Sequence, residues 1–508
     1  MQRNQDPPSG IQMTKISLGR EAADSEQDGP SQPDPKAGRR LFQVGCVGVA
    51  ALIAWNVHRS PVSDPLLLGA GVAMIALGAL PSLLWALRSS THFPVFEVFL
   101  LTFVPFYGLS LLAGHPEVMT FDDDATTGAA VAVLLFQGAA LAAYYGTSAP
   151  AVRTPLLTMP LVPDAFMRFA QAGLWLNSAY IYLNGFTQLI PYELSLPLRA
   201  TFFGIGNIAI YLEMRRWGSG GLTGTGKLIV AGNLLLQCVL LTRELYLIVA
   251  LSLLLVSAIA YLSTSRRIPW LGIMIVLPVA AVLHNGKPAM RSAYWDGGDA
   301  MPSLTDLPNF FSRWLEAGLQ PREATELRGN ASLTSQLFER ASLFHMLCLV
   351  VERTPEQRPF LNGESYAYIP SQLVPAFLWP GKPSSLKSNV LLAVHYRLVP
   401  EDGTARVSIA FGMVSESYAN FGYWGCAIAG TMLGLFYRRV SAAATGAPQF
   451  SAVGLLGILL GAWSFQTEQI FATWIVSLLQ ATSVVIALPL AFRMIFPASF
   501  LPPPPAES

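Results

Sequence analysis

Charged residues are scarce in this chain of 508 residues. Asp, Glu, Lys and Arg make up 12% of it, whereas about 25% is usual for soluble domains. Hydrophobic residues account for 52%, and the formal net charge is only +1. No basic run is long enough to indicate a nucleic-acid partner. The composition is typical of an all-α polytopic integral membrane protein.

Patterns of metal ligands and disulfides are also lacking. The four cysteines stand singly without a CxxC pair, and the six histidines form no HxxxH pair. Single cysteines in apolar segments usually behave as small buried hydrophobic residues. The acidic run at 122–124 is interpreted as a solvated turn. We therefore expect neither a bound metal nor a cofactor.

The first 40 residues lack the features of a cleaved signal, because they are polar, acidic and rich in proline. We interpret 1–40 as a disordered cytoplasmic tail. Residues 497–508 contain four consecutive prolines, and we interpret them as a second cytoplasmic tail.

Long apolar segments fill most of the remaining chain. A helix needs about 20 mostly apolar residues to cross the hydrocarbon core of a bilayer. About twelve segments qualify, nine of them within 41–284 and three within 418–496. They begin near residues 41, 65, 94, 127, 165, 198, 227, 245, 268, 420, 450 and 473. The weakest is 165–185, which contains Arg168, Gln171 and Asn177.

Charges between the spans predict their orientation, since basic residues concentrate on the cytoplasmic side. With the N-terminus inside, seven successive inner positions are basic. The outer turns are mixed or acidic and include Arg199, Glu244 and Glu468. Both termini are therefore predicted to be cytoplasmic, and the polar region 285–417 becomes one large extracytoplasmic loop before the last three spans.

The segment 227–263 is too long for one span and barely long enough for two. One span would place the pair Arg266 and Arg267 outside, against the charge rule. We therefore predict a hairpin that turns at Thr242, Arg243 and Glu244. An ionisable residue at this depth is costly unless it is paired, so Arg243 is either a functional residue or the partner of Glu244.

The large loop has three recognisable parts. Residues 333–351 have helical periodicity but are too short to span, so a surface or re-entrant helix is expected there. Residues 363–383 are rich in proline and aromatic residues, which suits contact with a sugar face or packing on the bundle. In the third part, Glu416 and Asn420 lie one helical turn apart. Glu416 has no basic neighbour in sequence, so it either finds one in space or ionises with difficulty.

Two groups of residues carry a resemblance to a known family. The first is Arg340, Gly363, Tyr366, Ile369-Pro370 and Leu378-Trp379-Pro380-Gly-Lys382-Pro383, and the second is Glu416-x-Tyr418-x-Asn420-Phe421-Gly422-x-x-Gly425. Together they resemble the O-antigen polymerases (Wzy-like) and oligosaccharide repeat-unit polymerases, most sharply over 340–425. Thr242-Arg243-Glu244 is similar to a short arginine turn in these proteins.

The resemblance implies transfer of a growing glycan from polyprenyl diphosphate onto the next lipid-linked repeat unit. The expected location is the outer face of the bacterial inner membrane. The expected substrates are oligosaccharides linked to polyprenyl diphosphate, with a flippase and a chain-length regulator as possible partners in the bilayer.

The chemistry of this transfer selects candidate residues. A departing diphosphate needs fixed cations, for which Arg suits bidentate binding; the candidates are Arg243, Arg340, Lys382 and Arg291, with ordinary solvated loop charges as the alternative. The accepting hydroxyl needs a base. Glu416 is the first candidate and His345, which is otherwise a packing residue, the second. The candidates for glycan binding are Tyr366, Trp379, Tyr418 and Asn420.

Other functions remain alternatives. A ligase would differ only in its acceptor. A flippase or transporter would favour short loops and polar residues in mid-span, and ion carriers often show internal repeats. A polyprenyl-monophosphate-sugar transferase usually has acidic residues in the first outer loop, where only Asp64 occurs. A membrane peptidase would use Cys348 near His345, which lie only three residues apart in an apolar run.

Overall fold

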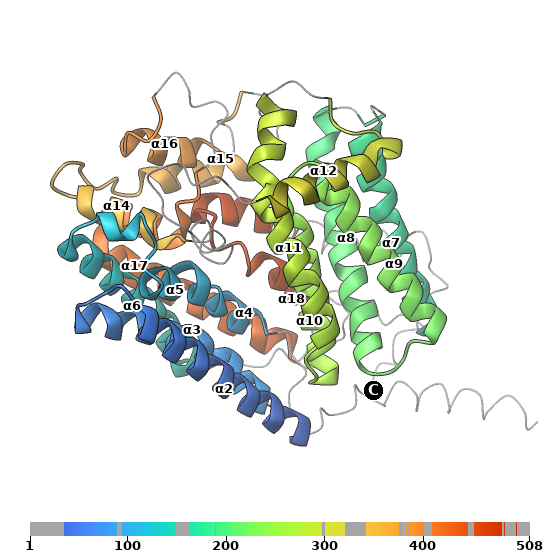
Figure 1. Cartoon of the computed structure of the whole chain (residues 1–508), viewed down its shortest axis with the longest axis horizontal. Helices are drawn as coiled ribbons and strands as arrows, with labels where there is room; N and C mark the ends of the chain where they lie inside the picture. Colours follow the sequence, from blue (N-terminus) through green and yellow to red (C-terminus); the bar gives the residue numbers. More distant parts are fainter. Residues whose placement is uncertain are drawn as a thin grey trace, which may run out of the picture.

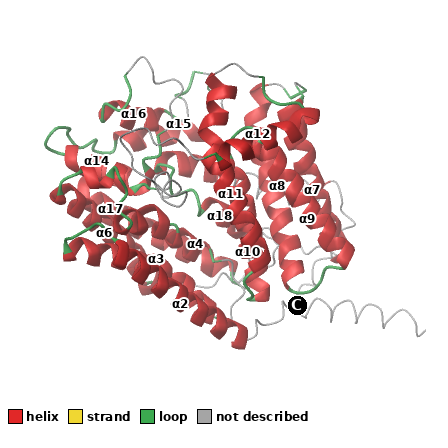
Figure 2. Cartoon of the chain, in the orientation of Figure 1, coloured by secondary structure: helices red, strands yellow, loops and turns green. Residues whose placement is uncertain are grey.

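A computed structural model describes most of the chain, and in the described part helices connected by loops are the only regular secondary structure (Figure 2). The residues it describes are 35–88, 94–148, 163–187, 189–190, 192–296, 300–320, 342–374, 379, 381–383, 386–400, 409–445, 452–479, 482 and 494.

One group of helices is formed by the N-terminal spans together with a helix from near the C-terminus (Figure 1). Its members are α2 (Pro35–Arg59), α3 (Pro65–Leu87), α4 (Val95–Leu101), α5 (Leu109–Leu112), α6 (Asp123–Gly146) and α17 (Gly412–Ala444). A π-helical turn at Val104–Gly108 joins α4 to α5. The side chain of Asp64 caps the first turn of α3 by accepting a hydrogen bond from the Leu66 N–H, as expected at a helix start.

A second group stands beside the first (Figure 1). It consists of α7 (Pro163–Phe186), α8 (Tyr192–Gly218), α9 (Gly224–Thr242), α10 (Leu247–Ser265) and α11 (Trp270–Arg291). Helix α18 (Ala452–Trp463) packs on α8 and α10 of this group and on α4 and α17 of the first. It therefore lies at the junction between the two groups.

Short helices lie along the upper side of Figure 1. They are α12 (Leu307–Leu319), α14 (Phe344–Arg353), α15 (Ile369–Leu373) and α16 (Lys387–His395). Helix α12 is fixed to α11 because the Trp314 indole donates to the Leu283 carbonyl at 2.7 Å and Asn285 donates to Gly318 at 2.6 Å. These contacts accompany a continuation of α11 to Arg291, past the start predicted for the loop.

Six helical segments of the described chain are long and apolar enough to cross a membrane. They are Pro35–Arg59, Pro65–Leu87, Val95–Leu112, Asp123–Gly146, Gly224–Thr242 and Trp270–Trp295. The protein is therefore an all-α multi-pass membrane protein. Helices α7, α8 and α17 are also long, but they carry more polar residues. The total of twelve spans and the orientation stay predictions.

The segment 227–263 forms the predicted helical hairpin. Helix α9 ends at Thr242, α10 begins at Leu247, and the two pack against each other. Leu245, in the turn between them, has a left-handed φ of 61°.

Close packing joins α6 to α17. A Cβ added to Gly430 would lie 2.3 Å from the Phe136 carbonyl oxygen, and one added to Gly434 would lie 2.3 Å from that of Ala140. This small-xxx-small pattern lets two backbones approach closely where lipid surrounds the helices.

Helix α17 is broken within the second sequence motif. Phe421 and Gly422 leave helical geometry, and Gly422 has φ of 60° and ψ of −144°, a conformation open to glycine almost alone. A Cβ on Gly425 would lie 2.1 Å from the Ser417 carbonyl oxygen. Both motif glycines are thus required by the backbone. The part of α17 before the break, which carries Glu416, lies outside the six candidate spans.

Candidate functional site

The two sequence motifs meet through hydrogen bonds. Ser365 Oγ donates to Glu416 Oε1 at 2.8 Å, and Asn420 Nδ2 donates to Ser365 Oγ at 2.8 Å. The Gly363 N–H, in a left-handed conformation with φ of 93°, donates to Asn420 Oδ1 at 2.9 Å. The 363–366 segment is therefore fixed to the first turns of α17.

Glu416 is fully buried at the centre of this network. Its second oxygen accepts a hydrogen bond from the Phe471 N–H, and the Ala472 N–H also contributes. These N–H groups begin the helix at 471–479, whose N-terminal end attracts negative charge. Burial nevertheless raises the pKa of Glu416 to about 7, against the opposing effect of these donors.

Two predicted glycan-binding tyrosines lie around the same network. The Tyr366 O–H donates a hydrogen bond to Ser417 Oγ at 3.4 Å, and the Tyr366 ring lies near the rings of Phe421 and Phe471. Tyr418 instead packs edge to face on Tyr423, with ring centroids 5.1 Å apart. Tyr418 is also buried, with 5% of its surface exposed.

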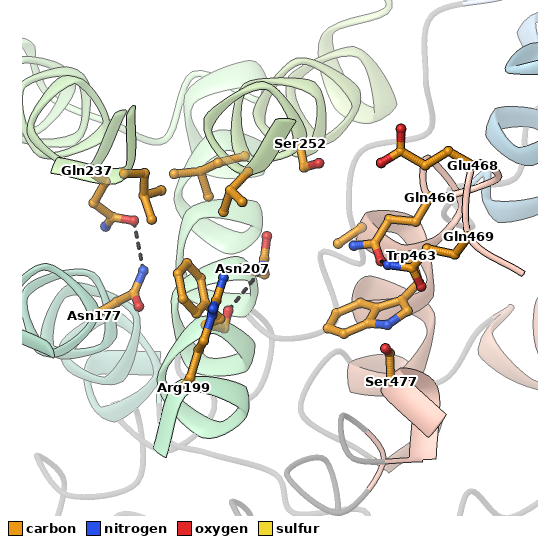
Figure 3. A pocket seen from close by; sticks show the side chains of 15 residues that line it. Asn177, Arg199, Asn207, Gln237, Ser252, Trp463, Gln466, Glu468, Gln469 and Ser477 are labelled. Carbon is orange, nitrogen blue, oxygen red and sulfur yellow. Dashed lines mark hydrogen bonds between the residues drawn. The ribbon is translucent and has the colours of Figure 1, made fainter. Parts of the chain in front are cut away.

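A polar cavity of about 320 Å³ lies between α7–α10 of the second group and α18 with the residues that follow it. Figure 3 shows Asn177, Arg199, Asn207 and Gln237 on one wall, with Trp463, Gln466, Glu468 and Gln469 on the other. Its lining residues are Asn177, Arg199, Phe203, Asn207, Gln237, Leu241, Val249, Ser252, Leu253, Ala462, Trp463, Gln466, Glu468, Gln469 and Ser477.

The cavity contains one cationic and one carboxyl side chain. Arg199 projects from α8 and Glu468 from the non-helical segment 464–470 that follows α18. Burial raises the pKa of Glu468, while the charge of Lys287 on α11 opposes this shift. A carboxyl group with a raised pKa is suited to accept or donate a proton.

The segment 464–470 connects this cavity to the Glu416 network. The Gly412 N–H donates to the Glu468 carbonyl at 3.1 Å, and Thr467 Oγ1 donates to Thr102 Oγ1 at 3.0 Å. Glu416 holds the same segment at its far end through Phe471. Non-helical backbone inside a membrane protein is tolerated where it is buried in protein or lines a cavity, and here it carries Glu468.

Two of the predicted diphosphate-binding arginines are used to hold the α9–α10 turn. Arg243 donates to the Pro302 carbonyl at 2.8 Å and to the Gly185 carbonyl at 2.7 Å. Arg291 donates to the Leu245 carbonyl at 3.2 Å and lies over the Trp295 ring. Neither arginine lines the polar cavity.

His345 lies in a separate cluster. Its Nε2 is 3.3 Å from the Glu117 carboxylate, and its ring stacks on His115 with centroids 5.1 Å apart. Burial lowers the pKa of His345, Glu117 opposes the shift, and His115 adds to it. This cluster joins α14 to the turn after α5. Cys348 of the same helix is fully buried, and burial raises its pKa, which disfavours a thiolate.

Of the remaining candidates, Lys382 and Trp379 do not line the cavity. Lys382 Nζ donates to the Val374 carbonyl at 2.8 Å within its own tract. Trp379 is 45% exposed. Arg340 lies outside the residues that the structure describes. Within the described ranges, no group of three or more His, Cys, Asp or Glu residues is arranged to hold a metal ion.

Comparison with known proteins adds no relative. No protein-family model, curated protein or solved structure matches this chain.

The sequence-based reasoning missed the two charged residues of the cavity. Arg199 and Glu468 were used only as charges of separate outer turns. Nothing in their local sequence links them, because Arg199 on α8 and Glu468 after α18 are far apart in the chain. The sequence predicted only that Arg199 and Glu468 both lie on the outer side of the membrane. That prediction does not show that they line the same cavity.

Proposed function

We propose that this protein is a membrane glycan polymerase. It would transfer a growing chain from polyprenyl diphosphate onto the next lipid-linked oligosaccharide repeat unit, in O-antigen or exopolysaccharide synthesis. The observation that carries the proposal is the polar cavity, which is lined by Arg199 and by Glu468, a carboxyl group of raised pKa on a segment bound by Glu416 of the second motif. The resemblance over 340–425 supports the same reaction.

The cavity offers groups for both halves of the transfer. The acceptor hydroxyl oxygen attacks the anomeric carbon of the donor, and the bond from that carbon to the diphosphate oxygen breaks. Glu468 accepts the hydroxyl proton, and Arg199 stabilises the negative charge of the departing diphosphate. Glu416 is then a positioning residue, because its buried carboxyl group holds the start of the 471–479 helix.

The other candidate cations take different places in this proposal. Arg243 and Arg291 stabilise the α9–α10 turn next to the cavity, since they bind carbonyl oxygens there. Arg340 stays a candidate for the second lipid-linked substrate. Lys382, Trp379 and Tyr366 are candidates for contact with the glycan outside the cavity.

The proposed location is the bacterial inner membrane, with both termini cytoplasmic and the 285–417 region periplasmic. This orientation places the cavity near the outer face, where lipid-linked repeat units would be delivered by a flippase. A ligase that moves finished glycan to another acceptor would use the same chemistry and is the alternative. A flippase or transporter is the alternative outside catalysis.

The deciding experiment is a deletion of the gene followed by size analysis of surface glycan and of lipid-linked intermediates. We expect long polymer to disappear, while single repeat units accumulate on the outer face. Full-length polymer on its lipid carrier would indicate a ligase. Single units trapped on the inner face would indicate a flippase and contradict the proposal.

The roles of the cavity charges are tested by complementing the deletion strain with variants. We expect Glu468→Gln to reduce polymerisation by about 10²-fold or more, the usual contribution of a general base, with normal amounts of protein in the membrane. Arg199→Ala should also be inactive, and Arg199→Lys should recover part of the activity. Glu356→Gln, which changes an exposed glutamate of the loop, is the matched control and should behave as wild type. Full activity of Glu468→Gln would remove Glu468 from the mechanism.

A further inference from the structure

One wall of the polar cavity is built from a ladder of buried amide side chains. Asn177 Nδ2 of α7 donates to Gln237 Oε1 of α9 at 2.8 Å. Gln237 Nε2 donates in turn to Asn233 Oδ1 at 2.7 Å, and Asn233 Nδ2 donates to Ser178 Oγ at 3.1 Å. Such interhelical bonds satisfy polar groups that lipid cannot.

The ladder fixes which atom of Asn177 stays open. Gln237 uses its amide nitrogen for Asn233 and for the Leu174 carbonyl, so it presents its oxygen to Asn177. Asn177 must therefore turn its nitrogen toward Gln237 and its oxygen away. Gly206 of α8 makes room for this arrangement, because a Cβ there would lie 2.1 Å from Asn177 Nδ2.

Three buried polar atoms of residues that line the cavity have no hydrogen-bond partner among the described residues. They are Asn177 Oδ1, Gln469 Oε1 and Trp463 Nε1. Asn177 is 1% exposed. Gln469 has its amide nitrogen committed to Gln466 Oε1 at 2.8 Å, which leaves the oxygen open. A buried polar group without a partner destabilises the folded protein, so three on residues around one cavity indicate a bound ligand that satisfies them.

We infer that these three atoms form a binding site for an uncharged sugar ring. The two amide oxygens accept hydrogen bonds, and the indole N–H donates one. A sugar hydroxyl can do both, and the Trp463 ring offers an apolar surface for a sugar face. A carboxylate would face two oxygens and be repelled, and a metal cation would be repelled by the indole N–H.

The inference rests on the proposed function in one respect: the sugar is taken to be the unit next to the diphosphate held by Arg199. Asn177 and Gln469 then become residues that determine specificity. They select a neutral sugar over an acidic one at this position of the repeat unit. They come from α7 and from the segment after α18, which are far apart in the chain.

The test measures binding to the purified full-length protein in lipid nanodiscs. The probes are farnesyl diphosphate, its glucose conjugate and its glucuronate conjugate. We expect the glucose conjugate to bind more tightly than farnesyl diphosphate, and the glucuronate conjugate to show no such gain. Asn177→Leu and Gln469→Met should each weaken the glucose conjugate about three- to tenfold, the loss of one hydrogen bond.

Controls separate this effect from misfolding. Ser178→Ala removes the end of the ladder without changing the cavity lining. This variant should still bind the glucose conjugate more tightly than farnesyl diphosphate. Unchanged binding of farnesyl diphosphate shows that each variant is folded. Equal or tighter binding of the glucuronate conjugate, or a full glucose gain in Asn177→Leu, would overturn the inference.

The outcomes also separate this inference from the proposed function. Polymerisation without glucose preference refutes the neutral-sugar site alone. Glucose preference in a protein whose deletion leaves surface polymer intact refutes the polymerase alone.

Discussion

At the scale of single residues, burial bears on the role of Glu416. From the sequence it was the first candidate for the base that accepts the proton of the acceptor hydroxyl. In the structure it is fully buried and binds Ser365 and the N–H groups of the 471–479 helix. A carboxyl group with no exposed surface is placed to hold three segments together rather than to meet an acceptor sugar.

The pKa of Glu416 predicts a pH dependence of stability. The folded protein holds a proton on this group up to about pH 7, whereas an unperturbed glutamate loses it near 4.5. Between these values the folded state binds more protons than the unfolded state, so stability falls as pH rises, by about 3 kcal/mol in total. Thermal unfolding of the detergent-purified protein from pH 4.5 to 8 measures this slope.

The control for this prediction is Glu416→Gln, which is neutral at every pH. As pH rises, the unfolding temperature of wild type should fall relative to that of Glu416→Gln. An identical pH slope in the two proteins would show that Glu416 does not titrate in this range.

At the scale of elements, α17 joins the motif network to the bundle. Its first turns hold Glu416 and Asn420, its break at Phe421 and Gly422 redirects the chain, and its second half packs on α6 through Gly430 and Gly434. A sequence reading can note the glycines. The sequence does not reveal that Gly422 adopts a left-handed φ, or that Gly430 is required because the α6 backbone approaches it closely.

The packing of α6 on α17 predicts an intolerance at Gly430. Gly430→Leu should destabilise the protein by about 1–3 kcal/mol, because the new side chain would meet the Phe136 backbone. Thermal unfolding in detergent measures the loss. Gly138→Leu on α6 is the matched control, since nothing lies within 4 Å of a Cβ at that glycine. Equal stability of the two variants would mean that α6 and α17 do not pack as described.

At the scale of the whole molecule, the cavity lies between α7–α10 of the second helix group and α18 with the residues that follow it. Arg199 belongs to one group, and Glu468 follows α18 at the junction (Figure 3). The site therefore depends on how the groups are held together. Glu416, Thr102 and Gly412 all contribute to this through the 464–470 segment.

The proposed orientation is testable by labelling cysteines from outside. In a cysteine-free variant, Glu356→Cys after α14 should react with a membrane-impermeant maleimide in intact spheroplasts. Arg439→Cys, at the opposite end of α17, should react only after permeabilisation, because Arg439 lies 17 residues beyond Gly422, which is about 26 Å along a helix. The reverse labelling pattern would show that the orientation in the membrane is opposite to the proposed one.

Composition and local pattern alone determined the class of this protein. The backbone N–H and C=O groups of a long apolar segment find their hydrogen-bond partners in lipid when the segment is helical. The helical fold and the 242–244 hairpin turn were therefore predictable. Glu416 and Asn420 were also placed correctly on one face, because a helical turn is a local property. The cavity was decided only by tertiary structure. Arg199, Asn177 and Glu468 come together through packing of helices far apart in the chain, and hydrogen bonds across that packing determine which polar atoms stay open.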